Sequence, residues 1–526
     1  MGNKPRFLSL VLLLAGTLPS IHAAETPDSL VPATRPLFSL DFTTIANFSS
    51  GEFAPYYIAS NSEALTVQGQ GIQEYLRVER PLLTQRRFEY GFGAAMSAGY
   101  TSDVDYRQWD SSEGRFAERG RHPGYASLRE AWAGVKYRGI FLYAGMKPQA
   151  DCLFDSALGS GDLVMSRNAR PIPQVRAGFI DFQDIPLTKG WVQIQGELAY
   201  GKMADSDWLK DHYNYYNSFI TTGVYIHYSR LYLRSNPRKP FYVTVGMQQA
   251  AQFGGTWQTY SQGVVTSSLE NKVKFKDFAN ALFPWTGGSS SAQGDIDYYS
   301  GNHLGSWDLV LTYRFRNGSE LKGYMQSPWE DGSGIGKLNG FDGVWGLEYR
   351  FPPEDKAVTA VLAEYIDFTN QSGPSHWAPG DFPGTTITGE ATGADDYYNN
   401  YMYNGWANYG MSIGTPFIKS PIYNTDGYMR FTDNRVRGFH LGAEGQPWPH
   451  LGWRALFSYR TSWGTPFLPA LRKRHDTSAM AEATFKPASV PGLTLSAAVA
   501  FDAGSLYGDN VGALIKANYV IPIRLK

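Results

Sequence analysis

The sequence is poor in cysteine and in net charge. Its 526 residues include one cysteine, Cys152, and 47 basic against 48 acidic side chains. A single cysteine excludes a disulfide-stapled scaffold and a multi-cysteine metal cluster. The missing basic excess excludes a protein that binds nucleic acid mainly through charge. Beyond the first 23 residues, no stretch approaches the roughly 20 consecutive apolar residues that a membrane-spanning helix requires.

Aromatic residues, by contrast, are abundant. They make up 15% of the chain, which also has 56 glycines, while charged residues reach only 18%. This aromatic content excludes a wholly disordered chain. The mean hydropathy of −0.33 is low for a membrane protein, but it is compatible with a barrel that has a wet interior and polar loops.

Residues 1–23 have the pattern of a secretory signal peptide. Lys4 and Arg6 precede a short apolar run at residues 7–15, and small residues around Ala23 supply a cleavage site. The alternative is a transmembrane anchor, which needs a longer run to span about 30 Å of hydrocarbon. We therefore expect residues 1–23 to be removed and the mature protein to be exported.

Much of the remaining chain alternates apolar residues with small or polar ones. Clear examples are residues 88–100, 307–315 and 511–525. Successive strand side chains face opposite sides of a sheet, so each segment has one apolar face. A soluble sandwich also alternates, but several of these runs reach about ten residues, more than the usual five or six of globular strands. Strands of about 9–11 residues with an apolar outside are typical of a transmembrane barrel.

Short and long connections follow one another along the chain. Asn317-Gly318 is the clearest short one, because it favours a two-residue hairpin turn. The others lie at 138–139, 235–239, 352–356, 446–451 and 486–492, and the long polar stretches are 101–126, 204–222, 254–306, 369–427 and 462–477. Outer-membrane barrels have short periplasmic turns and long extracellular loops. We therefore predict an all-β protein, a transmembrane antiparallel β-barrel in the cell outer membrane.

The predicted barrel occupies residues 56–526 and has about 18 strands. They start near residues 56, 74, 88, 127, 141, 174, 191, 223, 241, 307, 319, 341, 357, 428, 453, 478, 493 and 511. The segments near 56, 74 and 174 alternate less clearly, which leaves 16 strands as the alternative. Either even number returns the C-terminus to the periplasm. Residues 24–55 are predicted to form an N-terminal periplasmic segment.

Several short segments, in order, give the chain a resemblance to a known family. They are residues 158–171 (LGSGDLVMSRNARP), 301–308 (GNHLGSWD), 324–326, 330–334 (EDGSG), 364–366, 370–374 and 397–400 (YYNN). With them the chain resembles the Wzi family, outer-membrane proteins associated with capsule assembly at the cell surface. The resemblance implies a barrel of about 18 strands. Family members can carry an N-terminal helical bundle under the barrel, whereas residues 24–55 show no helical period.

The stretch 397–409 places six aromatic residues among asparagines. Aromatic faces pack on the C–H faces of sugar rings, and asparagine amides form hydrogen bonds with hydroxyl groups. The alternative is an interface girdle or internal loop packing. The candidate polysaccharide-binding residues from this stretch are Tyr397, Asn399, Asn400, Tyr401 and Trp406.

Charged residues in two other links complete the candidate site. Arg167 and Arg170 would bind the carboxylates of acidic sugars through paired hydrogen bonds, with a charge ladder in the lumen as the alternative. Glu330 and Asp331 would accept sugar hydroxyls or hold a cation, with solvated loop carboxylates as the alternative, and Trp329 beside them is also a candidate polysaccharide-binding residue.

Signals for catalysis are few. The sequence has no His-Glu-x-x-His zinc motif, and its nine histidines have no cysteine at ligand spacing. Residues 410–414 (GMSIG) match a nucleophile elbow, but Pro416 argues against the helix that should follow it. We predict no enzyme activity, no cofactor and no metal, although glycoside cleavage by two distant carboxylates stays open.

Three functions fit the predicted barrel. The first is binding of capsular or other surface polysaccharide, with a role in capsule assembly or attachment. The second is a substrate-selective porin, and the third is a barrel hydrolase. The first two differ in whether links 254–306 and 369–427 fill the lumen or leave it open. The expected partners are polysaccharide and outer-membrane lipid but no nucleic acid, and the chain is expected to be a monomer.

Overall fold

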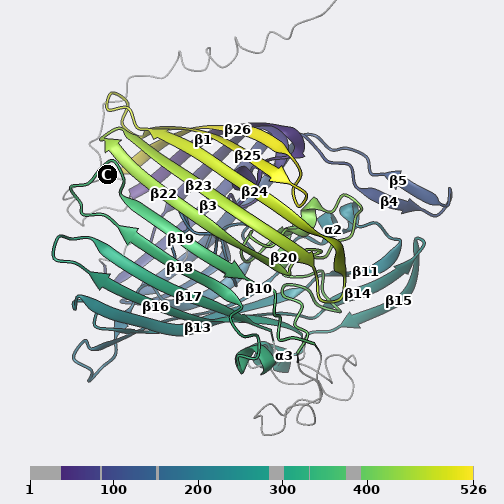
Figure 1. Ribbon diagram of the computed structural model, residues 1–526, viewed down its shortest axis with the longest axis horizontal. Helices are drawn as coiled ribbons and strands as arrows, with labels where there is room; N and C mark the ends of the chain where they lie inside the picture. The colour runs from purple at the N-terminus through teal and green to yellow at the C-terminus, as the bar shows by residue number, and fades with distance from the viewer. Residues whose placement is uncertain are drawn as a thin grey trace, which may run out of the picture.

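Eighteen antiparallel strands form the closed wall of a barrel in the computed structural model (Figure 1). The structure describes residues 37–82, 86–149, 153–282, 301–330, 332–374 and 393–524. The wall strands are β1 (Leu37–Phe53), β2 (Gln68–Arg80), β3 (Phe88–Thr101), β6 (Tyr125–Tyr137), β7 (Ile140–Met146), β8 (Gln174–Phe179), β10 (Val192–Lys202), β12 (Tyr225–Ser235), β13 (Phe241–Phe253), β16 (Asn302–Arg314), β17 (Glu320–Trp329), β18 (Gly343–Arg350), β19 (Ala360–Asp367), β22 (Val436–Trp448), β23 (Leu451–Gly464), β24 (Pro469–Phe485), β25 (Leu493–Gly504) and β26 (Asn510–Arg524). The two-residue β9 (Gln183–Asp184) continues β8 along the same edge of β10. The predicted antiparallel barrel of about 18 strands is confirmed.

Strand β1 closes the barrel, because it pairs with β26 on one edge and with β2 on the other. Its register with β26 begins where Leu37 lies opposite Arg524. The prediction that residues 24–55 precede the barrel is therefore wrong from Leu37 onward: a wall in hydrocarbon must leave no unpaired edge, and β1 supplies the missing ladder. Residues 24–36 and the predicted signal peptide, residues 1–23, lie outside the described residues.

The strand expected near residue 56 is a short helix instead. Pro55 precedes α1 (Tyr56–Ala59), and positive φ angles at Asn61 and Glu63 turn the chain before it enters β2. Strand β1 takes its place in the count. The strand expected near residue 428 begins only at Val436, because the chain before it runs inside the barrel.

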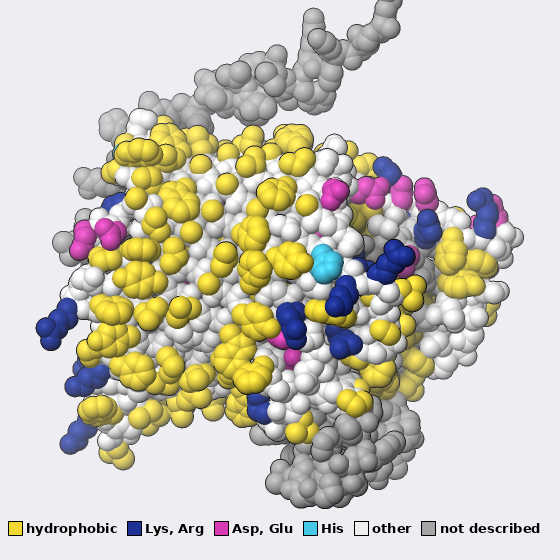
Figure 2. Space-filling model, in the orientation of Figure 1, with side chains coloured by type: hydrophobic (Ala, Val, Ile, Leu, Met, Phe, Trp, Pro, Cys, Tyr) yellow, Lys and Arg dark blue, Asp and Glu magenta, His cyan; other side chains and the backbone are white. Residues whose placement is uncertain are grey.

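Large apolar side chains cover the outside of the wall, where Figure 2 shows them as a broad band. They alternate with inward residues that are mostly polar or small, as in β24, where Asp476, Ser478 and Met480 are buried and their neighbours are not. Exposed members of the band include Phe48, Leu76, Met96, Leu142, Leu231, Val245, Leu347, Leu441, Val499 and Ile515. A closed ladder with an apolar exterior is the arrangement that lipid demands. The protein is an outer-membrane β-barrel.

The two rims of the wall differ in the length of their connections. At the rim that holds the C-terminus, strands are joined by short turns such as residues 138–139 and 315–319, which makes this rim periplasmic. At the opposite rim most of the predicted long links are present, but the prediction of a long link at 462–477 is wrong, because β23 and β24 extend to a four-residue turn at 465–468. The hairpin of β4 (Arg107–Asp110) and β5 (Arg115–Glu118) and the sheet of β11 (Asn217–Thr222), β14 (Gly255–Ser261) and β15 (Val264–Asn271) project from this extracellular rim (Figure 1).

The remaining elements of the described chain are short and lie in the links. They are α2 (Ser206–His212), α3 (Phe275–Leu282), α5 (Gly332–Ile335), β20 (Ala407–Asn408), β21 (Met411–Ser412) and the 3₁₀ helix η1 (Pro421–Tyr423). In the described part of the chain, every helix is too short or too polar to cross a membrane.

Candidate functional site

Three links fold into the barrel and fill its lumen. We call them together the plug: residues 54–67 between β1 and β2, residues 153–173 between β7 and β8, and residues 393–435 between β19 and β22. Their apolar side chains form one continuous core with inward-facing wall residues such as Ile226 and Leu304. The plug is therefore packed against the wall as a protein interior is packed.

The segment that carries the first part of the family resemblance, residues 158–171, lies at the centre of the plug. The Asp162 carboxylate accepts hydrogen bonds from Gln248 Nε2 at 2.7 Å and from Gln326 Nε2 at 2.9 Å, two side chains on different wall strands. The Ser160 amide donates to Glu364 Oε2 at 2.8 Å on a third strand. Buried polar groups need such partners, so the bonds fix the segment across the lumen.

Residues 393–435 lie against this segment and are bonded to it. Trp406 Nε1 donates to the Val164 carbonyl at 2.7 Å, and the Tyr398 hydroxyl donates to the Leu163 carbonyl at 2.5 Å. Within the described residues, link 369–427 thus fills the lumen. Residues 283–300 of the other predicted link, and residues 375–392, lie outside the described chain.

Three predicted polysaccharide-binding side chains are buried, Tyr397 and Trp406 in the plug and Trp329 at the end of the wall strand β17. Trp329 and Trp406 are 0% exposed and Tyr397 is 1% exposed. The Tyr397 hydroxyl donates to Asp342 Oδ2 at 3.1 Å and accepts from Asn339 Nδ2 at 3.0 Å. The prediction that these three side chains bind polysaccharide is wrong for this structure, because none of their rings has an exposed face. The alternative of internal loop packing accounts for them.

The two predicted arginines also lie in the plug. Arg167 is ion-paired with Glu63, its Nε 3.1 Å from Glu63 Oε1, and the guanidinium of Arg170 lies 4.0 Å from the ring centroid of Tyr409. Both border a space of about 30 Å³, which has room for little more than water. The structure therefore separates them from the other predicted residues and favours the lumen charge ladder.

Four other predicted residues do come together, at a cavity of about 580 Å³ in the extracellular mouth. They are Glu330 at the end of β17 and Asn399, Asn400 and Tyr401 on the link between β19 and β22. Asp331 lies outside the described residues. The rest of the lining comes from the start of β16, residues 393–396, residues 428–431 and the tip of the β23–β24 hairpin, residues 465–468.

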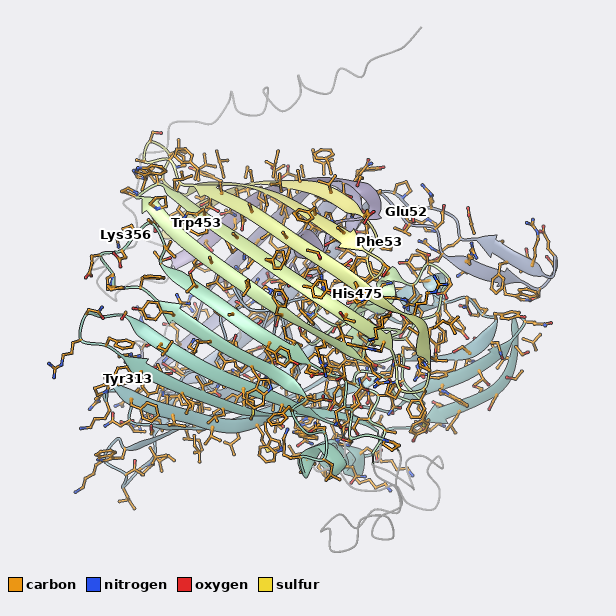
Figure 3. All side chains as sticks on the ribbon, in the orientation of Figure 1. Glu52, Phe53, Tyr313, Lys356, Trp453 and His475 are labelled. Carbon is orange, nitrogen blue, oxygen red and sulfur yellow. The ribbon has the colours of Figure 1, made fainter. Side chains whose placement is uncertain are left out.

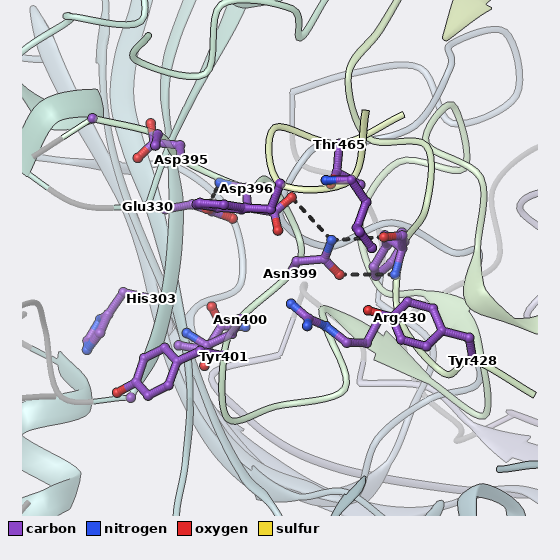
Figure 4. Close-up of a pocket in the computed structure, with 17 residues that line it drawn as sticks. His303, Glu330, Asp395, Asp396, Asn399, Asn400, Tyr401, Tyr428, Arg430 and Thr465 are labelled. Atoms are coloured by element: carbon purple, nitrogen blue, oxygen red, sulfur yellow. Dashed lines mark hydrogen bonds between the residues drawn. The ribbon is translucent and has the colours of Figure 1, made fainter. Parts of the chain in front are cut away.

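Backbone hydrogen bonds hold Glu330 at the cavity wall. Its carboxylate accepts from the Tyr398 amide at 2.8 Å and from the Asp396 amide at 3.2 Å. Burial, reinforced by the Asp395 carboxylate nearby, raises the pKa of the Glu330 carboxyl well above its usual range. Burial also raises the pKa of Asp396. Figure 4 shows Glu330, Asp395 and Asp396 gathered on one side of the cavity.

Asn399 fixes the opposite wall of the cavity (Figure 4). Its Nδ2 donates to the Phe431 carbonyl at 2.9 Å and to Asp396 Oδ1 at 3.2 Å, and its Oδ1 accepts from the Phe431 amide at 3.0 Å. Asn399 is therefore fully engaged in holding residues 428–431 in place. Tyr401, by contrast, is 41% exposed and presents part of its ring to the cavity.

Several lining residues escaped prediction, notably Arg430, Phe467 and Leu468. Phe467 and Leu468 are exposed at a hairpin tip. Two adjacent apolar residues in a turn are unusual, and this feature of the sequence could have indicated a binding surface. Arg430 has no such signal, because it is an isolated cation in a polar link. Its Nε is buried without a hydrogen-bond partner in the described structure.

The matched elbow pattern has no catalytic geometry. Ser412 lies in β21, is 0% exposed and donates its hydroxyl to the Thr415 carbonyl at 3.3 Å. A nucleophile elbow needs an exposed serine at a strand-to-helix turn. Among the described residues, no group of three histidine, cysteine, aspartate or glutamate side chains is placed to hold a metal ion.

Comparison with known proteins supports the fold. No family model and no curated protein matches the sequence. Among solved structures, one similar barrel is Wzi of Escherichia coli, described as an outer-membrane, carbohydrate-binding β-barrel involved in group 1 capsule assembly; its TM-score is 0.52 at 13% identity, over 92% of this chain and 85% of that one. OccAB2 of Acinetobacter baumannii (TM-score 0.44, 10% identity, 93% and 98% covered) and OprD of Pseudomonas aeruginosa (0.44, 9%, 93% and 96%) also match. At these identities the likeness shows an outer-membrane barrel, and membership of the Wzi family stays a prediction.

Proposed function

We propose that the protein binds a surface polysaccharide at its extracellular mouth and assists capsule assembly or attachment. The observation that carries this proposal is a lumen filled by a hydrogen-bonded plug beneath an extracellular cavity. A cavity of about 580 Å³ lies within the size range of ligand sites. The described Wzi structure, a carbohydrate-binding barrel, has the same fold.

The groups at the cavity suit a polyhydroxylated ligand. Tyr401 offers a ring face for the C–H side of a sugar, and the Asn400 amide and the Glu330 carboxyl offer donors and acceptors for hydroxyls. With its pKa raised, Glu330 keeps a proton at higher pH than an ordinary carboxyl and so donates as well as accepts. Single contacts of this kind are weak, and repetition along a polymer raises retention.

The plug argues against the porin alternative. An 18-stranded wall without a plug is wide enough for an aqueous channel. Here Asp162, Ser160 and Trp406 tie the plug to the wall and to itself through buried hydrogen bonds. A solute would have to break several of them to pass, and each broken bond leaves a buried group unpaired at a cost of about 1–3 kcal/mol.

Binding of purified capsular oligosaccharides to the barrel in lipid nanodiscs tests the proposal. Tyr401→Ala should weaken binding about tenfold, because losing about 50 Å² of apolar contact costs about 1.3 kcal/mol. Phe116→Ala is the matched control, since Phe116 on β5 is 40% exposed and lies outside the cavity lining. Equal affinities of the wild type and the Tyr401 variant would show that the polysaccharide does not bind at this cavity.

A further inference from the structure

Four basic side chains lie at the extracellular rim among three neighbouring strands of the wall. We call them, with the ring of Trp463, the rim patch: Arg435, Arg437, Arg472 and Lys473. Figure 2 shows blue Lys and Arg side chains just beyond the apolar band, around the histidine that Figure 3 labels as His475. Arg437 lies at the extracellular end of β22 and Arg435 directly precedes this strand, while Trp463 belongs to β23 and Arg472 and Lys473 belong to β24.

Alternation along the strands turns Arg437 and Lys473 outward, whereas Arg472 is exposed beside Lys473 at the end of β24, where the register with β23 shifts. In β22, Arg437 is exposed, as are Phe439 and Leu441 of the apolar band at alternate positions below it. Lys473 shares this direction with His475 in β24, because the inward positions there are Asp476, Ser478 and Met480. Arg437 and Lys473 flank Trp463, their charged groups 5.9 Å and 5.5 Å from the ring centroid.

Two tryptophans on one strand give the height of the rim patch in the membrane. Trp453 and Trp463 share the outward face of β23, at its two ends. Their spacing corresponds to about 33 Å along a strand, or about 25 Å across the membrane at the usual tilt, which is the height of the apolar band of a barrel. Tryptophan collects at both interfaces of a membrane. The rim patch therefore lies at the level of the outer-leaflet headgroups.

The charges of the rim patch are only partly neutralised by the protein. Arg437 Nε lies 2.8 Å from Asp367 Oδ2, on the neighbouring strand. Arg435 donates to the Thr369 carbonyl at 3.1 Å, which leaves its charge unopposed. For Arg472 and Lys473, no carboxylate of the described chain lies within ion-pair distance. Arg474 is excluded from the patch, because it faces inward and is paired with Asp433.

We propose that the rim patch binds the phosphate groups of phosphorylated glycolipids in the outer leaflet. Lipid must cover the apolar band directly below, so headgroups of the same lipids face the rim patch. Among headgroup chemistries, phosphate complements a cluster of arginine and lysine best, since guanidinium groups bind it through paired hydrogen bonds. Trp463 supplies the amphipathic ring that fits the boundary between chain and headgroup.

The rim patch and the cavity share one hairpin. Residues 465–468 at the tip of β23–β24 line the cavity, while Trp463 and Lys473 below the tip face the lipid. A phosphate bound outside would hold this hairpin against the leaflet and with it one wall of the cavity.

Native mass spectrometry of the detergent-purified barrel with diphosphorylated lipid A tests the assignment. The wild type should retain the diphosphorylated form at least about tenfold better than the dephosphorylated form. Arg435→Gln, Arg472→Gln and Lys473→Gln combined should remove that preference. The matched control combines Arg238→Gln, Lys356→Gln and Lys486→Gln on exposed periplasmic turns, and it should keep the preference.

Two results would overturn the assignment: equal retention of both lipids by the wild type, or an unchanged preference in the rim variant. A dimer in the wild-type spectrum that the rim variant abolishes would also overturn it, because the patch would then hold a second copy. If the triple variant does not assemble, Arg472→Gln with Lys473→Gln gives the same test with two exposed side chains. Heat-modified gel mobility establishes assembly of each variant before binding is measured.

Discussion

The wall and the plug use the same large apolar residues in opposite ways. On the wall, Leu347 and Val499 point outward and are 55% and 60% exposed, because lipid covers them. In the plug, Trp406 and Phe417 are 0% exposed, because they belong to one core formed by plug residues and by inward-facing residues of the wall. The wall is thus stabilised by burial of its apolar face in lipid and by the backbone hydrogen bonds between its strands. The plug is stabilised by side-chain packing and by specific hydrogen bonds.

We expect the plug, and not the wall, to determine the function. The wall is a generic scaffold that any outer-membrane barrel needs. We expect the plug, which fills the lumen, to determine whether the barrel conducts, and Asn399 and Asn400 of the plug line the cavity. Changes that affect wall and plug unequally therefore test the account.

Removal of plug residues 153–171, replaced by a short Gly-Ser linker, should have the largest effect. The linker is easily spanned, because Gly145 and Gln174 at the two ends are paired across β7 and β8. Residues 393–435 would lose their partners Leu163 and Val164, and the lumen should open to water. Cells that express this variant should take up large hydrophilic antibiotics that the wild-type barrel excludes.

A deletion of the β4–β5 hairpin tip is the control for that experiment. Residues 109–116 project from the extracellular rim, and their removal leaves the plug contacts in place (Figure 1). This control should not change uptake. Unchanged uptake with the plug deletion as well would show that residues 153–171 do not seal the lumen.

Trp406→Ala and Trp345→Ala compare one substitution in the two regions. Trp406 is fully buried and donates to Val164, so its loss should cost about 3–5 kcal/mol. Trp345 lies on the lipid side of β18 and is 36% exposed, and lipid would replace much of its contact, so the cost should be less than half. Limited proteolysis in micelles should cleave the plug of the Trp406 variant first. Equal cleavage of both variants would contradict the distinction.

A smaller effect should follow from pH. Burial raises the pKa of Asp342, in the link beneath the cavity, to about 6, from about 4 in an unfolded chain. The folded protein then holds a proton that the unfolded chain releases, so this stabilisation is complete below about pH 4 and is lost as pH rises through about 6. The melting temperature should be higher at pH 4.5 than at pH 7. Asp342→Asn should lower the melting temperature at both pH values but reduce the difference between them. An unchanged difference would show that other groups cause the pH dependence.

The sequence predicts the wall far better than the plug, for a physical reason. Residues 88–100 and 511–525 alternate because lipid and lumen impose a period of two, which is visible locally. Trp406 contacts Val164, which is 242 positions away, and no local period marks such a contact. From the sequence alone, the plug aromatics were therefore predicted to be exposed sugar-binding residues, although the structure shows that they are buried.

The candidate site was predictable only in part. Glu330, Asn399, Asn400 and Tyr401 were singled out by composition, and the structure brings them to one cavity. Arg167 and Arg170 had the right chemistry but lie elsewhere, since their partners Glu63 and Tyr409 come from distant links.

Planar-bilayer recording of the purified wild-type barrel shows whether the plug seals the lumen beneath the cavity. The buried bonds of Asp162 and Trp406 to the wall and within the plug should hold under an applied voltage. We predict insertion without large, stable open-channel currents, both with and without capsular oligosaccharide. Large, stable currents from the wild type, blocked in steps by a permeating solute, would contradict the account and make the protein a porin.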